Sequence, residues 1–516
     1  MIIKTMSDPL YSTPLSVPGH VYISVTNLAN LASLPSCTLR IDVFVHLGLN
    51  VEGNTSELTL TLVEDVIVQL SQQGGFVLHS GPQTPDVDFG IVEINGPIEA
   101  TLNALIWTQS NPLVESYPGG FFRFEGHSDH RNEFSKQVVL SKLTTIVASW
   151  FGLPNVSTNV NNNAWLLRKT LLAAEDARIP VYIPPGDYTF DETLFPDLDP
   201  HPITLQGAKS GQSIITLAEG TYLIEMEGES TTNRLKGVSV RHLNFVGDEY
   251  TNNNQPISLQ FAEDVDISSC RFGNLLRSIQ TKSVYNCRTT DNSSQDIRNH
   301  CFYNRQAEIF DGDEYVDYYG SKNIIVRNNK FVRCPKNVSL TSNRAVIFSA
   351  YNNPDDIPDN VNIAERHKSC MTAHNHFSDQ RCTSVDMIAI CRSFLANGNI
   401  IEMVVEEFTQ NEPMTMGGNW QERTNGVLSA DQAGGEEFLL GMNNIINERN
   451  SAGSILLYSQ GESALFWANQ IIGGRTAFYM SFNGENHPEY VRLQRNVFFN
   501  MNNTGASLFG VGDVIL

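Results

Sequence analysis

The chain has 516 residues, a formal net charge of −22 and a mean hydropathy of −0.20. This length exceeds one ordinary domain and is sufficient for a large apolar core. The acidic balance argues against nucleic acid and anionic membranes as partners, because both favour basic surfaces. There is no apolar run of about 18 residues and no signal-peptide segment at the start, so we expect neither membrane insertion nor export through the secretory pathway.

Eight cysteines are scattered along the chain without a C-x-x-C pair, which argues against a disulfide framework and against a zinc site. We expect them to be buried thiols. The segment 125–131 holds two histidines and an aspartate, but a polar stretch between strands is more typical of a solvated loop than of a metal site. No phosphate-binding loop or dinucleotide fingerprint occurs, so no metal and no cofactor is expected.

The N-terminal part divides into an arm, a β-rich segment and a linker. Residues 1–18 are polar and interrupted by prolines, which predicts an extended arm without a core. From residue 19 to 149 apolar residues alternate with polar ones, for example at Leu39 and Ile41 and at Leu58 and Leu60. Short strands separated by Gly-, Pro- and Asn-rich turns predict an antiparallel β-sandwich. The Asn-rich residues 150–163 are interpreted as a linker.

A short amphipathic helix and a broken strand follow. Asn163 is a good N-cap, and four apolar residues lie on one face of the helix: Ala164, Leu167, Leu171 and Ala174. The strand from residue 181 to 183 is stopped by two prolines and a glycine. This helix followed by VYIPPGDYTF resembles the beginning of right-handed parallel β-helix proteins of the pectate-lyase-like superfamily. In that family the helix plugs the open end of the solenoid, and the Pro-Pro-Gly strand begins the first coil.

From about residue 181 a unit repeats, in which a short strand and a polar turn precede an asparagine placed two residues before an apolar anchor. The units are Asn329 with Phe331, Asn375 with Phe377, Asn399 with Ile401, Asn444 with Ile446, Asn469 with Ile471 and Asn496 with Phe498, and two earlier units carry Leu243 with Phe245 and Cys270 with Phe272. Their spacings are 27, 59, 46, 24, 45, 25 and 27 residues, which we interpret as single coils of about 25 residues and, for 46, 45 and 59, double steps. Such a period predicts a β-solenoid with asparagine amides bonded along a column.

The predicted fold is therefore all-β: an N-terminal antiparallel β-sandwich, then a right-handed single-stranded parallel β-helix over residues 164–516, capped by a short α-helix. The repeat is interrupted at about residues 282–318, 351–362 and 403–436. Insertions in a solenoid leave the coil as loops on one face, and such loops commonly form the binding surface.

The first and third insertions hold the residues expected to act on a glycan. Glycoside hydrolysis needs two carboxyl groups, one of them kept protonated, and aromatic rings offer flat faces to sugars. The candidate catalytic residues are Asp311, Asp313, Glu314 and Asp317, and the candidate substrate-binding residues are Tyr315, Tyr318, Tyr319, Trp420 and Glu422. Both insertions also fit the description of solvated loops. A lyase would need a base and a cation instead, for which the candidates are Arg366, His367, His374, His376 and Arg381.

A polar arm, a small sandwich and a large β-helix without an export signal resemble a bacteriophage tailspike or receptor-binding protein. The resemblance implies attachment to other virion proteins through the N-terminal region and binding of host surface polysaccharide, capsule or O-antigen, by the β-helix, often with cleavage. It also implies a homotrimer on the virion surface, made in the host cytoplasm without a signal peptide. The alternative is a non-catalytic adhesin or structural spike of the tail or capsid vertex. Whether the protein is an enzyme, and whether hydrolase or lyase, stays open.

Overall fold

The computed structural model describes residues 37–41, 44–48, 59–62, 64–70, 75–79, 91–100, 120–125, 137–153, 163–175, 179–195, 201–209, 211–247, 254–305, 307–311, 314–334, 345–349, 362–365, 367–380, 384–388, 393–403, 414–416, 437–447, 453–457, 463–481, 490–509 and 513–515. The chain divides into two compact units. Unit 1 is Met1–Pro196 with Pro202–Ile215, and unit 2 is Asp197–His201 with Thr216–Leu516. The predicted arm, residues 1–18, lies outside the described residues.

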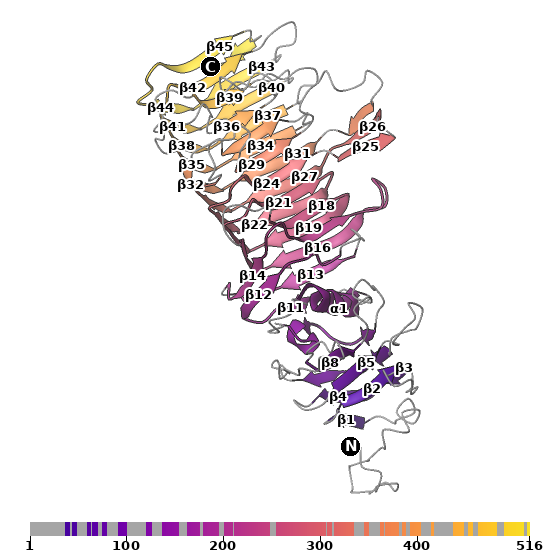
Figure 1. The fold of residues 1–516 in the computed structure, drawn as a ribbon. Helices are drawn as coiled ribbons and strands as arrows, with labels where there is room; N and C mark the ends of the chain where they lie inside the picture. The colour runs from indigo at the N-terminus through magenta and orange to yellow at the C-terminus, as the bar shows by residue number, and fades with distance from the viewer. Residues whose placement is uncertain are drawn as a thin grey trace, which may run out of the picture. The chain divides into compact units, whose positions relative to one another are not determined.

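Unit 1 begins with three small parallel sheets of three strands each (Figure 1). Their strands are β1 (Cys37–Ile41), β2 (Phe44–Gly48), β3 (Thr59–Leu62), β4 (Val66–Leu70), β5 (Gly75–His79), β6 (Ile91–Ile94), β7 (Ile98–Ala100), β8 (Phe122–Glu125) and β9 (Val138–Leu140). The sheet orders are β1-β4-β7, β2-β5-β8 and β3-β6-β9, and all the pairings are parallel. Every third strand returns to the same sheet, which is the connectivity of a coil with three strands per turn.

The antiparallel β-sandwich predicted for residues 19–149 is therefore wrong in its strand pairing. Alternation with a period of two identifies a strand and its buried face, but it does not give the direction of the neighbouring strand. Cys37 pairs with Val66 and Phe76 pairs with Phe122, so the partners are 66 − 37 = 29 and 122 − 76 = 46 residues apart. These sequence separations fit the long crossover connections that parallel strands need. Antiparallel strands can be joined by a hairpin of only a few residues.

The predicted helix forms, but it is buried on every side. Unit 1 continues with β10 (Ile146–Val147), the 3-10 helix η3 (Ala148–Phe151), α1 (Asn163–Glu175), β11 (Val181–Tyr182), β12 (Gly186–Phe190) and β13 (Ile203–Gln206), and β14 (Ser213–Leu217) begins in it. All residues of α1 from Asn163 to Ala174 are buried, because β9, β10 and η3 contact the helix as well as β11, β12 and β13. Trp165 meets Phe124 edge-on at 5.1 Å between ring centroids. Asn163 donates its amide to the carbonyl of Thr189 at 2.8 Å.

The segment predicted to be a linker begins inside this packing. Trp150 and Phe151 are 5% and 0% exposed, and residues 154–162 lie outside the described residues. In the described part of the chain, α1 falls short of the length and apolarity that would let a helix cross a bilayer.

Unit 2 is a parallel β-helix built from three long sheets. Sheet I contains β16 (Leu235–Arg241), β19 (Ala262–Ser268), β22 (Tyr285–Thr290), β27 (Lys322–Arg327), β31 (Lys368–Ala373), β34 (Ser393–Asn397), β37 (Glu437–Gly441), β40 (Ser463–Trp467), β43 (Tyr490–Gln494) and β46 (Asp513–Ile515). Sheet II contains β17 (Asn244–Gly247), β20 (Arg271–Gly273), β23 (Ser293–Gln295), β28 (Lys330–Val332), β32 (His376–Gln380), β35 (Ile400–Met403), β38 (Asn444–Asn447), β41 (Gln470–Gly473) and β44 (Val497–Phe499). Sheet III contains β15 (Tyr222–Glu227), β18 (Gln255–Gln260), β21 (Arg277–Lys282), β24 (His300–Arg305), β29 (Val346–Ser349), β33 (Val385–Ile388), β36 (Met414–Met416), β39 (Gly453–Leu457), β42 (Thr476–Ser481) and β45 (Thr504–Phe509).

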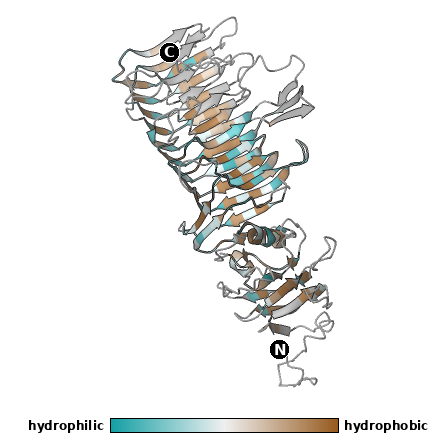
Figure 2. Ribbon diagram, viewed as in Figure 1, coloured by the Kyte–Doolittle hydropathy of each residue, from teal (hydrophilic) through white to brown (hydrophobic). Residues whose placement is uncertain are grey.

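Neighbouring strands in these sheets run parallel and place like side chains over one another. Phe245 lies over Phe272 and Phe331 over Phe377, with ring centroids 5.3 and 4.8 Å apart, and all four rings are buried. Burying such a side chain stabilises the fold by about 2 kcal/mol. Figure 2 shows apolar and polar residues sharing most strands of unit 2, as expected for a coil with one face inside and one outside.

The predicted asparagine column is confirmed at the turn between sheets I and II. It comprises Asn292, Asn329, Asn375, Asn399, Asn443, Asn469 and Asn496. The Oδ1 atom of Asn375 accepts hydrogen bonds from the main-chain N–H and the side-chain amide of Asn329, at 2.9 and 3.0 Å. Its own Nδ2 donates to the carbonyl of Val326 and to Oδ1 of Asn399. Each coil thereby fixes the next.

Two details of the predicted register are wrong. The residue in the column is Asn443 instead of Asn444, and the anchor is Ile445 instead of Ile446, because Ile445 pairs with Ile471 and is fully buried. The sequence Asn-Asn-Ile-Ile fits both registers, so it does not decide between them. The steps of 46 and 45 residues are single coils enlarged by insertions, since β28 pairs directly with β32 and β35 with β38.

The neighbouring asparagines give a matched test of the column. Replacing Asn443 by Ala removes a buried amide that bonds to Ala396 and Asn469 and leaves the main-chain N–H of Asn399 without its acceptor. We expect a loss of about 1–3 kcal/mol of stability, seen as a lower Tm. Asn444→Ala, at a half-exposed position, should change stability by less than about 0.5 kcal/mol. Equal effects of the two substitutions would contradict the register.

Candidate functional site

The acidic insertion forms a hairpin outside the three long sheets. β25 (Ala307–Asp311) pairs antiparallel with β26 (Glu314–Tyr319), placing Asp311 opposite Glu314 and Ile309 opposite Asp317. β26 also pairs with β30 (Asn362–Glu365), and this small sheet stands off the coil beside β27 and β31 (Figure 1). Three of the four predicted catalytic residues are thus brought onto one hairpin. Asp313 lies outside the described residues.

Of the predicted substrate-binding residues, too, the structure describes only some. Tyr315, Tyr318 and Tyr319 all lie on β26, opposite Phe310, Glu308 and Ala307. Trp420 and Glu422 lie outside the described residues. The roles assigned to the hairpin residues stay predictions.

The three histidines considered for a lyase that the structure describes have different surroundings. His367 is fully buried, and its Nδ1 accepts a hydrogen bond from the main-chain N–H of Ser321 at 2.9 Å. His376, on the outer side of sheet II, lies 3.5 Å from Glu402. His374 occupies a turn with a φ of 54°. Arg366 and Arg381 lie outside the described residues.

The outer side of sheet III over β15, β18, β21 and β24 carries a polar and aromatic surface, which we call the sheet III face. It consists of Glu225, Glu227, Gln260, Arg277, Gln280, Lys282, His300, Tyr303 and Arg305. The register stacks Glu225, Ser258, Gln280 and Tyr303 in one column and Glu227, Gln260, Lys282 and Arg305 in the next. Met226 and Leu259, between the two columns, are buried in the interior, so the columns occupy the opposite side of the sheet.

Tyr303 is the centre of this face. The guanidinium carbons of Arg277 and Arg305 lie 5.1 and 5.7 Å from its ring centroid, and the ring of His300 lies 4.7 Å away. Nη1 of Arg277 donates to Oε1 of Gln280 at 2.8 Å. Cation–π contacts of this kind hold the guanidinium groups over the ring and fix their positions. The face therefore presents an aromatic ring bordered by cations and amides.

Arg277 is a half-buried cation without a carboxylate partner in the described part of the chain. Burial lowers the pKa of its guanidinium, with the tyrosines 303 and 222 acting in the opposite direction. Its Nε is buried and makes no hydrogen bond. A buried charge is costly unless an opposite charge or hydrogen bonds compensate it. Arg277 is therefore suited to receive an anionic group from outside the chain.

The two glutamates of the face have different surroundings. Burial raises the pKa of Glu225, and Lys282 offsets part of the rise. A raised pKa keeps a carboxyl protonated at higher pH, as a general acid requires. Glu227 accepts a hydrogen bond from Nε2 of Gln260, which orients its carboxylate. The carboxyl of Glu225 is thus partly buried, whereas that of Glu227 is held by a neighbouring amide.

A groove of about 1070 Å³ runs along the outer side of sheet I. Its polar end contains Asp264, Asp266 and Arg288, and its other end is apolar, with Ile325, Met371, Leu395, Leu439 and Leu465. The carboxylate of Asp266 pairs with Arg241, and that of Asp264 accepts a hydrogen bond from Asn286 at 3.1 Å. The described residues thus offer two candidate surfaces, this groove on sheet I and the sheet III face, which carries the half-buried Arg277 and the carboxyl of Glu225 with its raised pKa.

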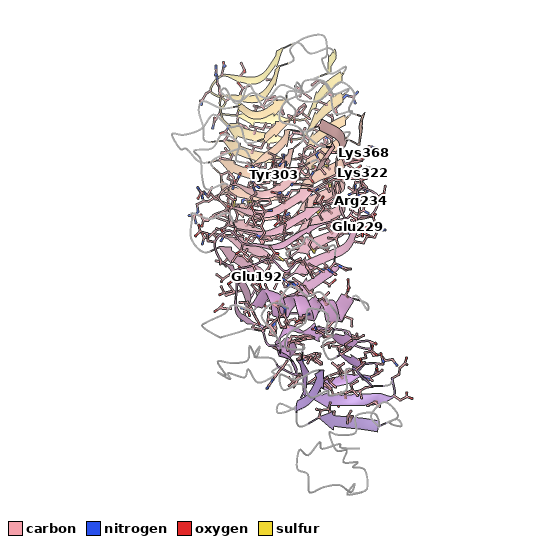
Figure 3. All side chains as sticks on the ribbon, turned by 45° about the vertical axis from the view of Figure 1, so that its right-hand side comes forward. Glu192, Glu229, Arg234, Tyr303, Lys322 and Lys368 are labelled. Carbon is pink, nitrogen blue, oxygen red and sulfur yellow. The ribbon has the colours of Figure 1, made fainter. Side chains whose placement is uncertain are left out.

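A row of cations follows the edge of sheet I. Arg234 is 6% exposed and lies 3.4 Å above the ring of Tyr285, and Lys322 lies 4.5 Å from the same ring. Arg234 also donates to the carbonyl of Ser283, which lies two coils further along the chain. Figure 3 shows Arg234, Lys322 and Lys368 one above another, apart from Tyr303. This row is structural and separate from the sheet III face.

Among the described residues, no group of three or more side chains is arranged to hold a metal ion.

Residues 157–365 match the family model described as rhamnogalacturonase A/epimerase, pectate lyase-like, which covers less than half of the chain. Three solved structures show similarity to this chain. An alginate lyase from Paenibacillus sp. shares 11% identity over 68% of this chain and 97% of its own, with a TM-score of 0.38. A surface adhesin of Streptococcus pneumoniae shares 12% identity over 70% and 93%, with a TM-score of 0.39. A thermostable α-1,3-glucanase from Streptomyces thermodiastaticus shares 12% over 72% and 70%, with a TM-score of 0.36. No curated protein sequence matches the chain.

The raised pKa of Glu225 predicts a pH-dependent gain in stability on substitution. The folded state binds the Glu225 proton more tightly than the unfolded state, so ionisation costs stability as pH rises above the ordinary pKa of about 4.5. Glu225→Gln carries no charge at any pH. We expect its Tm to exceed that of the wild type at pH 7 and to approach it near pH 4.

Glu263→Gln is the control for this substitution. Glu263 forms an ion pair with the exposed Lys236 at 3.8 Å, and a surface pair of this kind contributes little to stability. Its Tm should follow that of the wild type at both pH values. A Tm of Glu225→Gln below the wild-type Tm at pH 7 would contradict the assigned environment of Glu225.

Proposed function

We propose that the protein is a tailspike-like spike that binds a host surface polysaccharide, capsule or O-antigen, through the sheet III face of unit 2. The observation that carries this proposal is the gathering of Arg277, Arg305 and His300 around the ring of Tyr303 on the outside of a regular coil. The flat ring suits the apolar face of a sugar, and the surrounding guanidinium and amide groups suit hydroxyl and carboxylate oxygens.

The position of this face on a rigid coil supports the same function. The interior hydrogen bonds and stacked rings fix the backbone of β15, β18, β21 and β24, so the side chains of the face are held in place before a ligand arrives. Preorganisation lowers the entropy cost of binding. A polymer lying along the coil meets a new row of side chains at each strand, about every 4.8 Å.

We also propose that the protein is part of a virion. Unit 1 is compact by itself, which suits a separate role in attachment to other virion proteins, with unit 2 engaging the host. The protein is then located on the tail or capsid surface. Nucleic acid and membranes are not among its proposed partners, in keeping with the net charge of −22.

A homotrimer is proposed as the working assembly. The outer side of sheet I carries an apolar column of Ile325, Met371, Leu395, Leu439 and Leu465, aligned by the strand register. Leu439 is 37% exposed. No carboxylate interrupts this column, so two copies of this acidic chain can approach each other here without bringing carboxylates together. Another copy of the coil also presents its side chains at the same strand spacing.

Binding through the sheet III face is tested by Tyr303→Ala. Loss of the ring removes both its contact with sugar and the support of Arg277 and Arg305. We expect affinity for the recognised polysaccharide to fall about tenfold or more, corresponding to about 1.4 kcal/mol, in biolayer interferometry. Arg271→Ala, an exposed position on sheet II, should bind as the wild type does. Unchanged binding by Tyr303→Ala would place the polysaccharide elsewhere.

The assembly is tested by Leu439→Glu in sedimentation equilibrium. A charge in the apolar column should oppose association and convert a trimer into monomers, because the carboxylate would be buried without a partner. Ile472→Glu is the matched control, since Ile472 on sheet II is exposed to a similar extent, 36%, outside the column. A monomeric wild type, or dissociation by Ile472→Glu alone, would refute this contact.

A further inference from the structure

Two buried thiols meet where the coil returns from sheet II to sheet III. Cys301 lies on β24 of sheet III, and Cys334 follows β28 of sheet II. The two residues are 334 − 301 = 33 positions apart in the chain, yet their side chains hydrogen-bond to each other. Cys301 is 1% exposed and Cys334 is fully buried. The two thiols are therefore neighbours inside the coil.

A buried serine contacts both thiols. The Sγ atom of Cys334 lies 3.4 Å from the carbonyl oxygen of Ser294, and Cys301 hydrogen-bonds to the side chain of the same serine. The Ser294 hydroxyl lies 3.4 Å from that of Ser278, on the strand next to β24. A disulfide forms only where two cysteines can reach bonding distance without movement of the backbone. The shared contacts hold Cys301 and Cys334 together on adjoining strands, as such a bond requires.

Cys287 and Cys370 lie in one column of sheet I but are too far apart to be joined to each other. Each pairs in register with Ile324, one from either side, so they are two strands apart, about 10 Å. Cysteines whose Cα atoms are more than about 7 Å apart cannot be bridged without backbone movement. Cys270 places its sulfur 3.4 Å from the carbonyl of Ser268. These buried cysteines serve as internal controls.

A bond between Cys301 and Cys334 would close one full turn of the coil into a covalent ring. From Cys301 the chain passes through the hairpin of β25 and β26, then β27 in sheet I and β28 in sheet II, before it reaches Cys334. A cross-link of this kind removes conformations from the unfolded chain and so favours the folded state. It would also tie β24, which carries Tyr303, to the end of a strand of sheet II.

We propose that Cys301 and Cys334 are a redox-sensitive pair, which stays reduced in a reducing compartment and forms an intrachain disulfide when the chain meets a small disulfide oxidant such as oxidised glutathione. The proposal is independent of polysaccharide binding, because the bond and its effect on stability are properties of the coil alone.

The reaction balances with one molecule of the oxidant. The thiolate of one cysteine attacks a sulfur atom of the oxidant, whose own disulfide bond breaks and releases one thiolate. The thiolate of the second cysteine attacks the mixed disulfide, forms the bond between the two Sγ atoms and releases the second thiolate. The two protons lost by the cysteines go to the released thiolates, and the electron pair passes from the protein to the oxidant.

Burial determines when this reaction can occur. It raises the pKa of the Cys301 thiol well above its ordinary value, and the neighbouring Cys334 adds to the rise. The reactive thiolate is therefore scarce at neutral pH once the coil has closed. We expect oxidation to be fastest while the coil is still open, and the buried bond to resist reducing agents afterwards.

The experiment makes the full-length protein by cell-free synthesis in reduced and in oxidised glutathione, so that the reagent meets the chain before the thiols are buried. The folded protein is unfolded in a thiol-alkylating reagent and digested, and its peptides are identified by mass spectrometry without reduction. The Tm is measured on the product from each buffer. The variants are Cys301→Ser and Cys334→Ser, with Cys287→Ser as the control for a buried thiol elsewhere.

In oxidised glutathione the wild type should yield a peptide with Cys301 joined to one with Cys334, at least about tenfold more abundant than any other cysteine pair, because the geometry favours this pair. Its Tm should exceed that of the reduced protein. Cys287→Ser should form the same bond and show the same increase in Tm. Cys301→Ser and Cys334→Ser should have equal Tm values in the two buffers.

Three results would overturn the proposal. They are alkylated Cys301 and Cys334 in the folded protein made in oxidised glutathione, a bond from either residue to a different cysteine, and a wild-type Tm that oxidation lowers or leaves unchanged. Where a serine variant does not fold, the peptide map and the two Tm values of the wild type decide the question.

Discussion

The asparagine column at the turn between sheets I and II is the interaction on which unit 2 depends. Each buried amide satisfies a main-chain donor of the preceding column residue and a carbonyl of the preceding coil, for example from Asn375 to Asn329 and Val326. Because a buried amide without partners is costly, the column permits only one register between successive coils. The stacked phenylalanines beside it fill the interior with the same periodicity.

This internal order leaves the outside of the coil free to vary. Side chains on the outer side of each strand contribute little to the register, so these positions can hold polar, charged or aromatic residues without disturbing the coil. On sheet III the result is a cluster of arginine, tyrosine, glutamine and glutamate, and on sheet I it is an apolar column. The polar face holds contacts between a cation and a ring such as that between Arg277 and Tyr303, whereas the apolar column is the surface proposed to meet another copy of the chain.

The sequence predicted the features that repeat and missed those that depend on strand direction or on three dimensions. The column and its phenylalanine anchors recur at a regular spacing, and their positions from Asn329 to Asn399 agree with the structure. The pairing of β1 with β4 is parallel because the partner strand comes a whole coil later, which alternation does not show. The sheet III face was missed because Glu225, Arg277 and Tyr303 are far apart in sequence and lie inside ordinary strands. With the period of the coil known, aligning the strands in register would have predicted that these residues share one face.

The most direct test of the account is a crystal structure of the protein with a bound oligosaccharide from the recognised polymer. The account predicts a sugar ring against Tyr303 and sugar hydroxyl or carboxylate oxygens within hydrogen-bond distance of Arg277. An oligosaccharide bound instead in the groove of sheet I or against the β25–β26 hairpin, with the sheet III face empty, would contradict it.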